Sequence, residues 1–290
     1  MMPRNLFNDR CNRARQDGVA LVAVLWIVAA LSILVTGMVQ AQRDEIRLVS
    51  SARQTVQGSA LGSAAVQLVL QQMAARSEPV ARLSRIEVGF GGLTIPVEVV
   101  PLNGLIDLNR APEPLLVALF TVAGGLAPDL AAALAKSLVV ARTPGPLTQT
   151  GPRFEAIEDL LQLPGVDFGL YARLSPLVTT DALGGGRVNA MAAPQGVLLV
   201  ISGGDAARAA RIAADRDGGG AGVDTTDLSP QLIDTVATTR FRLVAQVPLP
   251  DGRKLLSSRW VETGKAAPDG VSWRIFQAED RFEQAPATMN

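Results

Sequence analysis

The sequence predicts an α+β fold, in which a long N-terminal helix packs on an antiparallel sheet and a large all-helical domain is inserted between the strands. Helical periodicity persists to about residue 76, short β-rich runs occupy residues 77–110 and 230–280, and a helical stretch punctuated by Pro and Gly, residues 111–229, lies between them. Residues 281–290 are predicted to be a tail.

The chain begins with an Arg-rich leader, residues 1–18, which is followed at once by the uncharged run 19–39. An α-helix rises about 1.5 Å per residue, so this run of 21 residues spans roughly 31 Å, close to the hydrocarbon thickness of a bilayer. Positive charge before a membrane helix favours the cytoplasmic side. We therefore expect a single-pass membrane protein whose C-terminal part lies outside the cytoplasm.

Three interpretations of the apolar run compete. A secretory signal cleaved after Ala41 would release a secreted protein such as a hydrolase, although the run is long for a signal peptide. A plain signal anchor would stay uncleaved. A third kind of leader is cut after Gly18, which leaves Val19 as the new N-terminus and keeps the apolar helix in the mature protein.

Helical periodicity continues through residues 40–76, a stretch without Pro from Gln40 to Ala75. This amphipathic half is predicted to pack on a folded domain. Its expected apolar face recurs at spacings of 3, 4 and 7 and consists of Ile46, Val49, Val56, Ala60, Ala64 and Leu68.

Two strands are predicted at 85–90 and 93–100, because Gly91 and Gly92 between them are typical of a tight hairpin turn. Three more strands are expected at 240–247, 253–262 and 271–277. The predicted helices of the insertion are 113–120, 128–141, 154–163, 167–174, 194–201 and 205–215.

The insertion contains a weak internal repeat, in which residues 106–112 match residues 188–194 at an offset of 82. Each copy has an Asp or Asn in an extended segment, then Ala-Pro, then a short apolar helix, with Pro expected in the first helical turn. Polar side chains in such motifs cap turns and helix starts, so we expect an architectural role.

The composition restricts the classes of function that the chain can have. The chain has 27 basic and 27 acidic residues, no histidine, and one cysteine, Cys11, in the leader. The commonest general base, the thiolate nucleophile and the commonest zinc ligands are therefore missing from the part after residue 18. We predict a structural or binding protein rather than an enzyme, with no resident cofactor and no general attraction to nucleic acid.

Residues 154–166 resemble half of a helix-hairpin-helix, the motif in which a Gly-rich hairpin offers backbone N–H groups to a DNA phosphate. Glu155, Glu158 and Asp159 oppose such binding through like charge, and Asp167 follows the hairpin. A membrane-anchored periplasmic protein for DNA binding or uptake is nevertheless the alternative function.

One acidic loop is a candidate metal site. Four carboxylates flank the glycine-rich segment 218–222, and an oxygen-rich loop can hold Ca²⁺. The spacing matches no EF-hand, and such loops are more often solvated. The candidate ligands are Asp215, Asp217, Asp224 and Asp227.

The Gly18-Val19 junction, the apolar helix and its amphipathic continuation resemble the type IV pilin and type II secretion pseudopilin families. The resemblance implies that a prepilin peptidase cuts after Gly18 and methylates the amine of Val19. Most members have Glu at the fifth mature position, where this chain has Ala23. That departure, with the large insertion, resembles the K component of the general secretion pathway, a minor pseudopilin whose relatives can carry calcium.

The resemblance places the single membrane helix in the inner membrane and the C-terminal domain in the periplasm. It implies a non-enzymatic subunit at the tip of a periplasmic pseudopilus, which initiates or caps the filament during export of folded proteins across the outer membrane. Its implied partners are the I and J minor pseudopilins and the major pseudopilin. In these families the Glu is thought to neutralise a neighbour's buried amine, and a buried unpaired charge costs several kcal/mol. A subunit without the Glu is therefore expected where no neighbour above needs neutralising.

Overall fold

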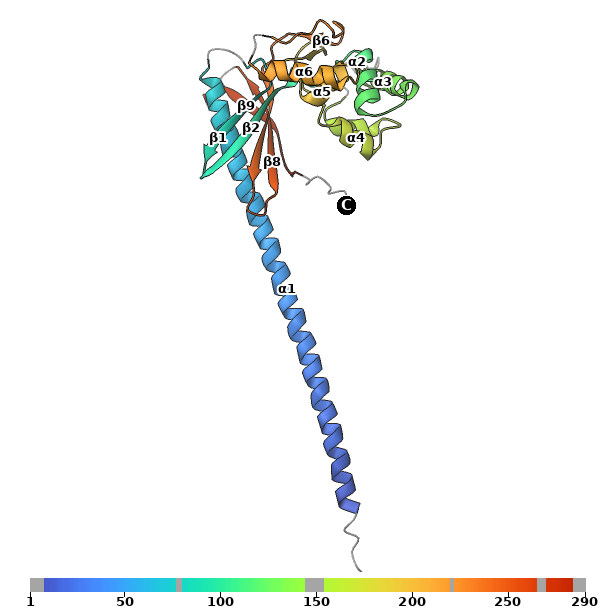
Figure 1. The fold of residues 1–290 in the computed structure, drawn as a ribbon, viewed down its shortest axis with the longest axis vertical. Helices are drawn as coiled ribbons and strands as arrows, with labels where there is room; N and C mark the ends of the chain where they lie inside the picture. Colours follow the sequence, from blue (N-terminus) through green and yellow to red (C-terminus); the bar gives the residue numbers. More distant parts are fainter. Residues whose placement is uncertain (1–7, 77–79, 144–153, 220–221, 265–269, 284–290) are drawn as a thin grey trace, which may run out of the picture. The chain divides into compact units, whose positions relative to one another are not determined.

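A computed structural model describes residues 8–76, 80–143, 154–219, 222–264 and 270–283 (Figure 1). Helix α1 is Asn8–Ala74, and its side chains are described at residue 22, at 24–32 and from 51 onward. The chain divides into two compact units, Met1–Gln57 and Gly58–Asn290, which are treated separately below.

The second unit contains a five-stranded antiparallel sheet in the order β1-β2-β7-β8-β9 (Figure 1). The strands are β1 Ser84–Phe90, β2 Leu93–Pro101, β7 Arg240–Pro248, β8 Lys254–Thr263 and β9 Trp273–Phe282. Gly91 and Gly92 have φ of +61° and +79°, as the predicted two-residue turn requires. The α+β class, the antiparallel sheet and all five predicted strands are confirmed.

Strand β9 extends beyond its predicted end at residue 277, through a charged stretch that has low intrinsic strand propensity. Its pairing with β8 explains the difference. Asp280 accepts a hydrogen bond from Arg259 at 2.8 Å, and Glu283 forms an ion pair with Lys254 at 3.2 Å. These cross-strand contacts are not visible in the local sequence.

Residues 58–74 of α1 cover one face of the sheet. The buried helix residues Ala65, Val66, Val69 and Leu70 share a core with alternate β7 residues such as Phe241. The predicted apolar face is therefore only partly right. Leu68 packs against this core and Ala64 is half-buried, but Val56 is 69% exposed and Ala60 is exposed too. Ile46 and Val49 lie outside the residues whose side chains are described.

Glycines explain which face of the helix is buried. A Cβ at Gly62 would lie 2.5 Å from the Cβ of Ser257, and one at Gly58 would lie 2.9 Å from a methyl of Leu255. The helix backbone therefore approaches β8 more closely than any side chain would allow. The hydrophobic pattern alone does not reveal this, because glycine contributes nothing to it.

The insertion between β2 and β7 contains several short helices. They are the 3₁₀ turn η1 Leu102–Gly104, α2 Glu113–Ala118, the π-turn η2 Leu119–Ala123, α3 Pro128–Arg142, the 3₁₀ helix η3 Ile157–Gln162, α4 Phe168–Leu174, α5 Gln195–Ile201 and α6 Ala206–Asp217. Where a longer helix was predicted at 154–163, only η3 forms. The Asp159 carboxylate accepts the N–H groups of Glu155 and Ala156, and Pro164 follows the segment.

The prediction of an all-helical insertion is wrong in one respect, since it contains two parallel strand pairs. Strand β3 (Ile106–Asp107) pairs with β4 (Val178–Thr179), and β5 (Val188–Asn189) pairs with β6 (Ile233–Asp234). Each pair joins segments at least 45 residues apart and is only two residues long. Such pairs have no periodic signal, so tertiary contact alone creates them.

The internal repeat is present in the structure. Asp107 Oδ1 accepts from the backbone N–H of Asn109 at 2.8 Å, and Asn189 Oδ1 accepts from that of Met191 at 3.0 Å. Both side chains thus close turns, as expected, but neither caps a helix. The two prolines of the motif precede α2 and α5 at the N-cap position rather than lying inside the first turn.

An arginine near the end of each second helix completes the repeat. Arg142 of α3 donates to the carbonyl of Ala111 at 2.7 Å, and Arg216 of α6 donates to that of Ala193 at 2.5 Å. The two alanines are related by the offset of 82. Each copy is therefore a strand, a turn and a helical hairpin whose last turn binds back to the start.

The two copies contact each other reciprocally through glycine. A Cβ at Gly104 would overlap the carbonyl oxygen of Ala192, and a Cβ at Gly186 would overlap that of Arg110. At the offset of 82, Gly104 corresponds to Gly186, and Arg110 corresponds to Ala192. Each copy therefore makes the same contact with the other, which is the signature of a two-fold arrangement.

Asp107 is a buried carboxyl group at this centre. It is 2% exposed, and its Oδ2 has no hydrogen-bond partner in the described part of the chain. Burial raises its pKa from 3.8 to about 6, although the N–H of Asn109 and the charges of Arg110 and Arg142 act in the other direction. A carboxyl with a raised pKa stabilises the fold fully below pH 3.8, and this contribution is lost as pH rises through about 6.

Gly104→Ala is expected to lower the free energy of unfolding by about 2 to 3 kcal/mol, because the new methyl group overlaps a backbone oxygen that cannot move freely. Gly185→Ala is the matched control, since no heavy atom lies within 4 Å of its added Cβ. Urea unfolding of both variants measures the difference. Equal losses would contradict the close contact.

Asp107→Asn is expected to remove the contribution of this site to the pH dependence of the free energy of unfolding. Between pH 7.5 and pH 5, we expect the wild-type chain to gain about 1 kcal/mol of stability through protonation of Asp107, whereas the variant gains none from this site. Asparagine keeps the acceptor for Asn109 and is the residue at the equivalent position 189. Urea unfolding at both pH values tests the prediction, and an unchanged slope in the variant would refute it.

Candidate functional site

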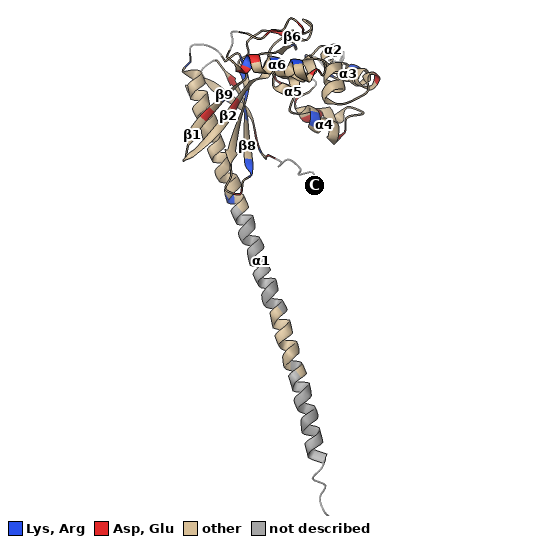
Figure 2. Cartoon of the chain, in the orientation of Figure 1, with Lys and Arg blue, Asp and Glu red and all other residues tan. Residues whose placement is uncertain are grey.

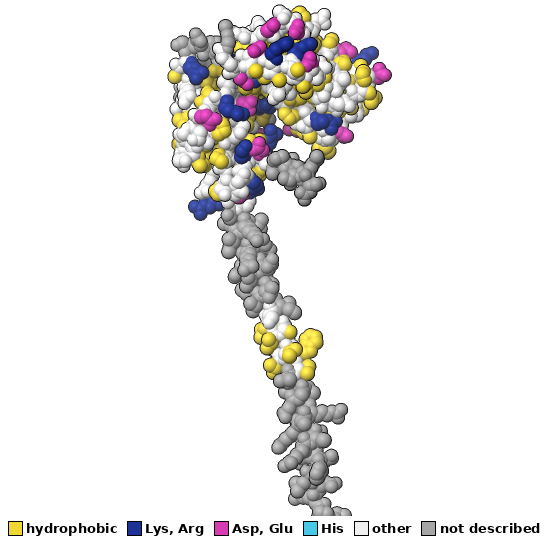
Figure 3. Space-filling model, in the orientation of Figure 1, with side chains coloured by type: hydrophobic (Ala, Val, Ile, Leu, Met, Phe, Trp, Pro, Cys, Tyr) yellow, Lys and Arg dark blue, Asp and Glu magenta, His cyan; other side chains and the backbone are white. Residues whose placement is uncertain are grey.

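The first unit displays an exposed apolar stretch of α1, visible in Figure 3. Trp26 is 72% exposed and Leu25 is 68% exposed. The other large apolar side chains of the stretch are more than half exposed, namely Val22, Val24, Ile27, Val28 and Leu31. A continuous apolar surface of this kind marks a membrane or protein contact.

The predicted processing residues Gly18 and Val19 belong to α1, as does Ala23, but their side chains lie outside the described residues. Most of the predicted membrane segment 19–39 is likewise outside them. Among the described residues, no helix is both long enough and apolar enough to cross a membrane.

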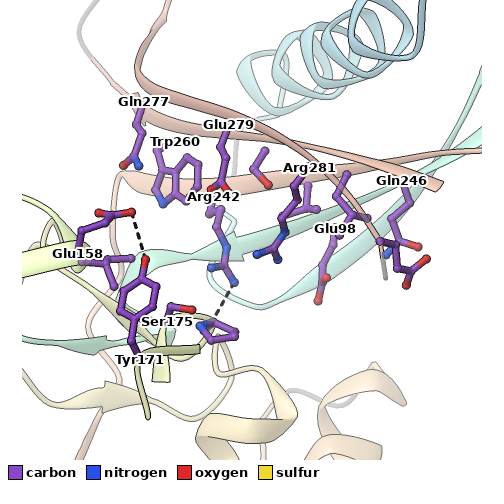
Figure 4. Close-up of a pocket in the computed structure, with 16 residues that line it drawn as sticks. Glu98, Glu158, Tyr171, Ser175, Arg242, Gln246, Trp260, Gln277, Glu279 and Arg281 are labelled. Atoms are coloured by element: carbon purple, nitrogen blue, oxygen red, sulfur yellow. Dashed lines mark hydrogen bonds between the residues drawn. The ribbon is translucent and has the colours of Figure 1, made fainter. Parts of the chain in front are cut away.

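The second unit has a hollow of about 210 Å³ on the sheet face opposite α1 (Figure 4). Strand residues form its floor, and the insertion closes one side through Tyr171 and Pro176. Glu98, Arg242, Trp260, Glu279 and Arg281 are the main charged and aromatic strand residues that line it.

Arg242 is an incompletely paired charge in this hollow. Its Nη2 lies 3.5 Å from the carbonyl oxygen of Pro176, and its Nε has no partner among the described residues. Burial lowers the pKa of the guanidinium; Glu98 opposes this effect, and the like charge of Arg281 adds to it.

On the insertion side, the Tyr171 hydroxyl donates to Glu158 at 3.2 Å. Burial raises the pKa of Tyr171, and the charge of Glu158 raises it further. The sequence analysis did not identify this hollow. The alternation of residues along β7 indicates this polar surface, because Arg240, Arg242 and Gln246 all occupy one face of the strand.

The four predicted metal ligands do not converge. Asp217 pairs with Arg216 at 2.7 Å, and Asp227 pairs with Arg211 at 3.1 Å. Asp224 accepts from Thr226, while Asp215 is exposed on α6, where charges of both signs are interspersed (Figure 2). No group of three acidic residues able to hold a metal ion occurs in the described ranges. Calcium binding stays a prediction.

These hydrogen bonds also lower the pKa values of two of the four carboxyl groups. A hydrogen bond from Arg216 lowers the pKa of Asp217, and hydrogen bonds from Thr226 lower the pKa of Asp224. Both carboxylates are therefore ionised at neutral pH, yet each is already engaged by a neighbour in its own loop.

The helix-hairpin-helix resemblance has a structural counterpart in η3, Gly165 and α4. Gly165 adopts φ of +92° in the turn. The Asp167 carboxylate accepts the N–H of Leu170 at 2.7 Å, so the helix start already has an anionic partner. A phosphate at this position would meet that carboxylate as a like charge.

No protein-family model and no curated protein matches this sequence. Among solved structures, the chain is similar to one in the crystal structure of the GspK-GspI-GspJ complex from the enterotoxigenic Escherichia coli Type 2 Secretion System. The two chains are 14% identical with a TM-score of 0.49, and the alignment covers 82% of this chain and 99% of the other.

Two arginines on the sheet make a paired test. Arg259 donates to Asp280 and to Ser63, both at 2.8 to 2.9 Å, so Arg259→Met is expected to lower the free energy of unfolding by about 1 to 2 kcal/mol. Arg242→Met removes a poorly paired, partly buried charge and is expected to leave stability unchanged or raised by about 1 kcal/mol. Thermal or urea unfolding measures both. A larger loss for Arg242→Met would show that its charge is better paired than described.

Proposed function

We propose that this chain is a non-enzymatic minor pseudopilin of a type II secretion system, of the K-component kind. The observation that carries the proposal is the two-part character of α1. Its described residues 22 and 24–32 expose large apolar side chains, whereas residues 58–74 of the same helix are packed on an antiparallel sheet through Gly58 and Gly62. A filament subunit needs this division, because one part of the helix contacts membrane or neighbours while the other carries the folded domain.

The leader would be removed in a processing step. A prepilin peptidase of the inner membrane would cut after Gly18 and methylate Val19, which leaves the apolar stretch at the new N-terminus. The mature chain would then be held in the inner membrane until it enters the filament, with its sheet and insertion in the periplasm.

Two features support a position at the filament tip. Ala23 supplies no carboxylate to neutralise a neighbour's amine, and leaving such a charge buried and unpaired would cost several kcal/mol. The insertion adds all of residues 102–239 between β2 and β7, a bulk that is tolerated where nothing stacks above. In this position the chain would join the I and J minor pseudopilins and initiate or cap the major pseudopilin filament.

Mass analysis of the mature N-terminus tests the proposal directly. We expect the chain from cells that express a prepilin peptidase to begin at a methylated Val19. A chain that begins at Met1, or at Gln42 after cleavage of a secretory signal, would refute the assignment.

Gly18→Leu is expected to leave the leader attached, because a bulky side chain would occupy the position where the resemblance places the peptidase cut. Loss of secretion of folded proteins should accompany it. Gly37→Leu, later in the same apolar run, is the matched control and is expected to be processed normally. Normal secretion by an unprocessed Gly18→Leu chain would contradict the mechanism.

A further inference from the structure

Helix α1 is attached to the sheet in two different ways. Residues 65–70 bury apolar side chains in the core, namely Ala65, Val66, Val69 and Leu70. In residues 58–63, by contrast, the two buried residues are Gly58 and Gly62, and Leu61 is only partly buried. Because glycine has no side chain to bury, the hydrophobic effect stabilises this second attachment much less than the first.

The segment 58–63 is also a weak helix by itself. Gly58 and Gly62 lie one helical turn apart, and glycine is among the least favourable residues in a helix interior. Serine, at positions 59 and 63, is a poorer helix former than alanine. This segment therefore needs other contacts to hold it on the sheet.

Ser59 and Ser63 supply those contacts from one face of the helix. The Ser59 hydroxyl donates to Oδ2 of Asp280 on β9. The Ser63 hydroxyl accepts from Nη2 of Arg259 on β8 at 2.9 Å. Arg259 and Asp280 pair with each other at 2.8 Å, so both serines bind a single ion pair. Hydrogen bonds to charged groups are stronger than those between neutral groups, so the two serines tie this segment to the sheet.

The sheet half of this contact does not depend on the helix. Ser257 donates to Oδ1 of Asp280 at 2.7 Å, and Arg259 also donates to the carbonyl of Ser258 at 2.8 Å. The ion pair would therefore stay closed if the two helix serines moved away, and water can replace their hydroxyl groups. Separation thus leaves no charge buried and unpaired, which would be the costly outcome.

We propose that Ser59, Ser63, Arg259 and Asp280 form a latch, and that segment 58–63 opens as a unit of its own. In the open state the two serines leave the ion pair and the segment separates from β8, while the apolar core keeps the following turns of α1 attached. Local opening of this kind is expected where few apolar contacts hold a segment. The proposal goes beyond the pseudopilin assignment and does not rest on it, because it concerns how much of α1 the folded domain holds.

Thiol labelling of the full chain in detergent measures the opening. Ser257→Cys, in a chain that also carries Cys11→Ser, is the reporter. Ser257 is fully buried, and a Cβ at Gly62 would lie 2.5 Å from its Cβ, so the thiol becomes accessible when the segment separates. Val261→Cys is the matched control, since Val261 is also fully buried on the same strand and belongs to the core that contains residues 65–70.

We expect the Ser257→Cys chain to be labelled at least tenfold faster than the Val261→Cys chain, because local opening exposes the first thiol and only unfolding of the core exposes the second. Equal labelling rates would show that the helix leaves the sheet as a whole, and would overturn the proposal. Leu255→Cys, beneath Gly58 and outside the latch, is a second reporter, which should also be labelled faster than Val261→Cys.

The double variant Ser59→Ala, Ser63→Ala tests the latch itself. Loss of the two hydrogen bonds should accelerate labelling of the Ser257→Cys chain about tenfold or more. Alanine is the better helix former, so a segment held by helix propensity alone would be labelled more slowly. Ser137→Ala is the control and should leave the rate unchanged, because the Ser137 hydroxyl donates to Ala133 of its own helix. Unchanged or slower labelling of the double variant would refute the latch.

Discussion

The insertion depends on two close backbone contacts, in which Gly104 approaches the carbonyl of Ala192 and Gly186 approaches that of Arg110. Because neither position has room for a Cβ, the two repeat copies can pack closely against each other. Gly104 also ends the turn that directly follows β2, so the same contact fixes where the insertion leaves the sheet. A single hydrophobic core then runs from Val100 at the end of β2 through both copies to Trp260 on β8.

The sheet consequently has two different faces. On one face, glycines 58 and 62 let α1 lie against β8, and apolar residues alternate along β7 beneath it. On the other face, charged residues meet the insertion. Arg240 contacts Asp181 and Glu262 there, but Arg242 is poorly paired, and part of the surface remains open as the hollow of Figure 4. Coverage by the insertion is partial because it is anchored at one end of β2 and β7 only.

The two copies of the repeat share the contacts that hold each of them together. Both copies keep the polar turn, the Ala-Pro step and the arginine that binds the alanine carbonyl, since these hold each copy together.

The sequence by itself determined the elements whose signals are local: the α+β class, the Gly91-Gly92 hairpin, the five strands, most helices and the repeat of 82 residues. Periodicity, turn residues and Pro are read within a few positions, so their consequences are visible along the chain. The tertiary structure alone decided the rest. The buried face of α1, the parallel strand pairs, the length of β9 and the hollow of Figure 4 depend on which distant backbones come into contact. At Gly62 and Gly104 that contact is set by the absence of a side chain, which no hydrophobic pattern records.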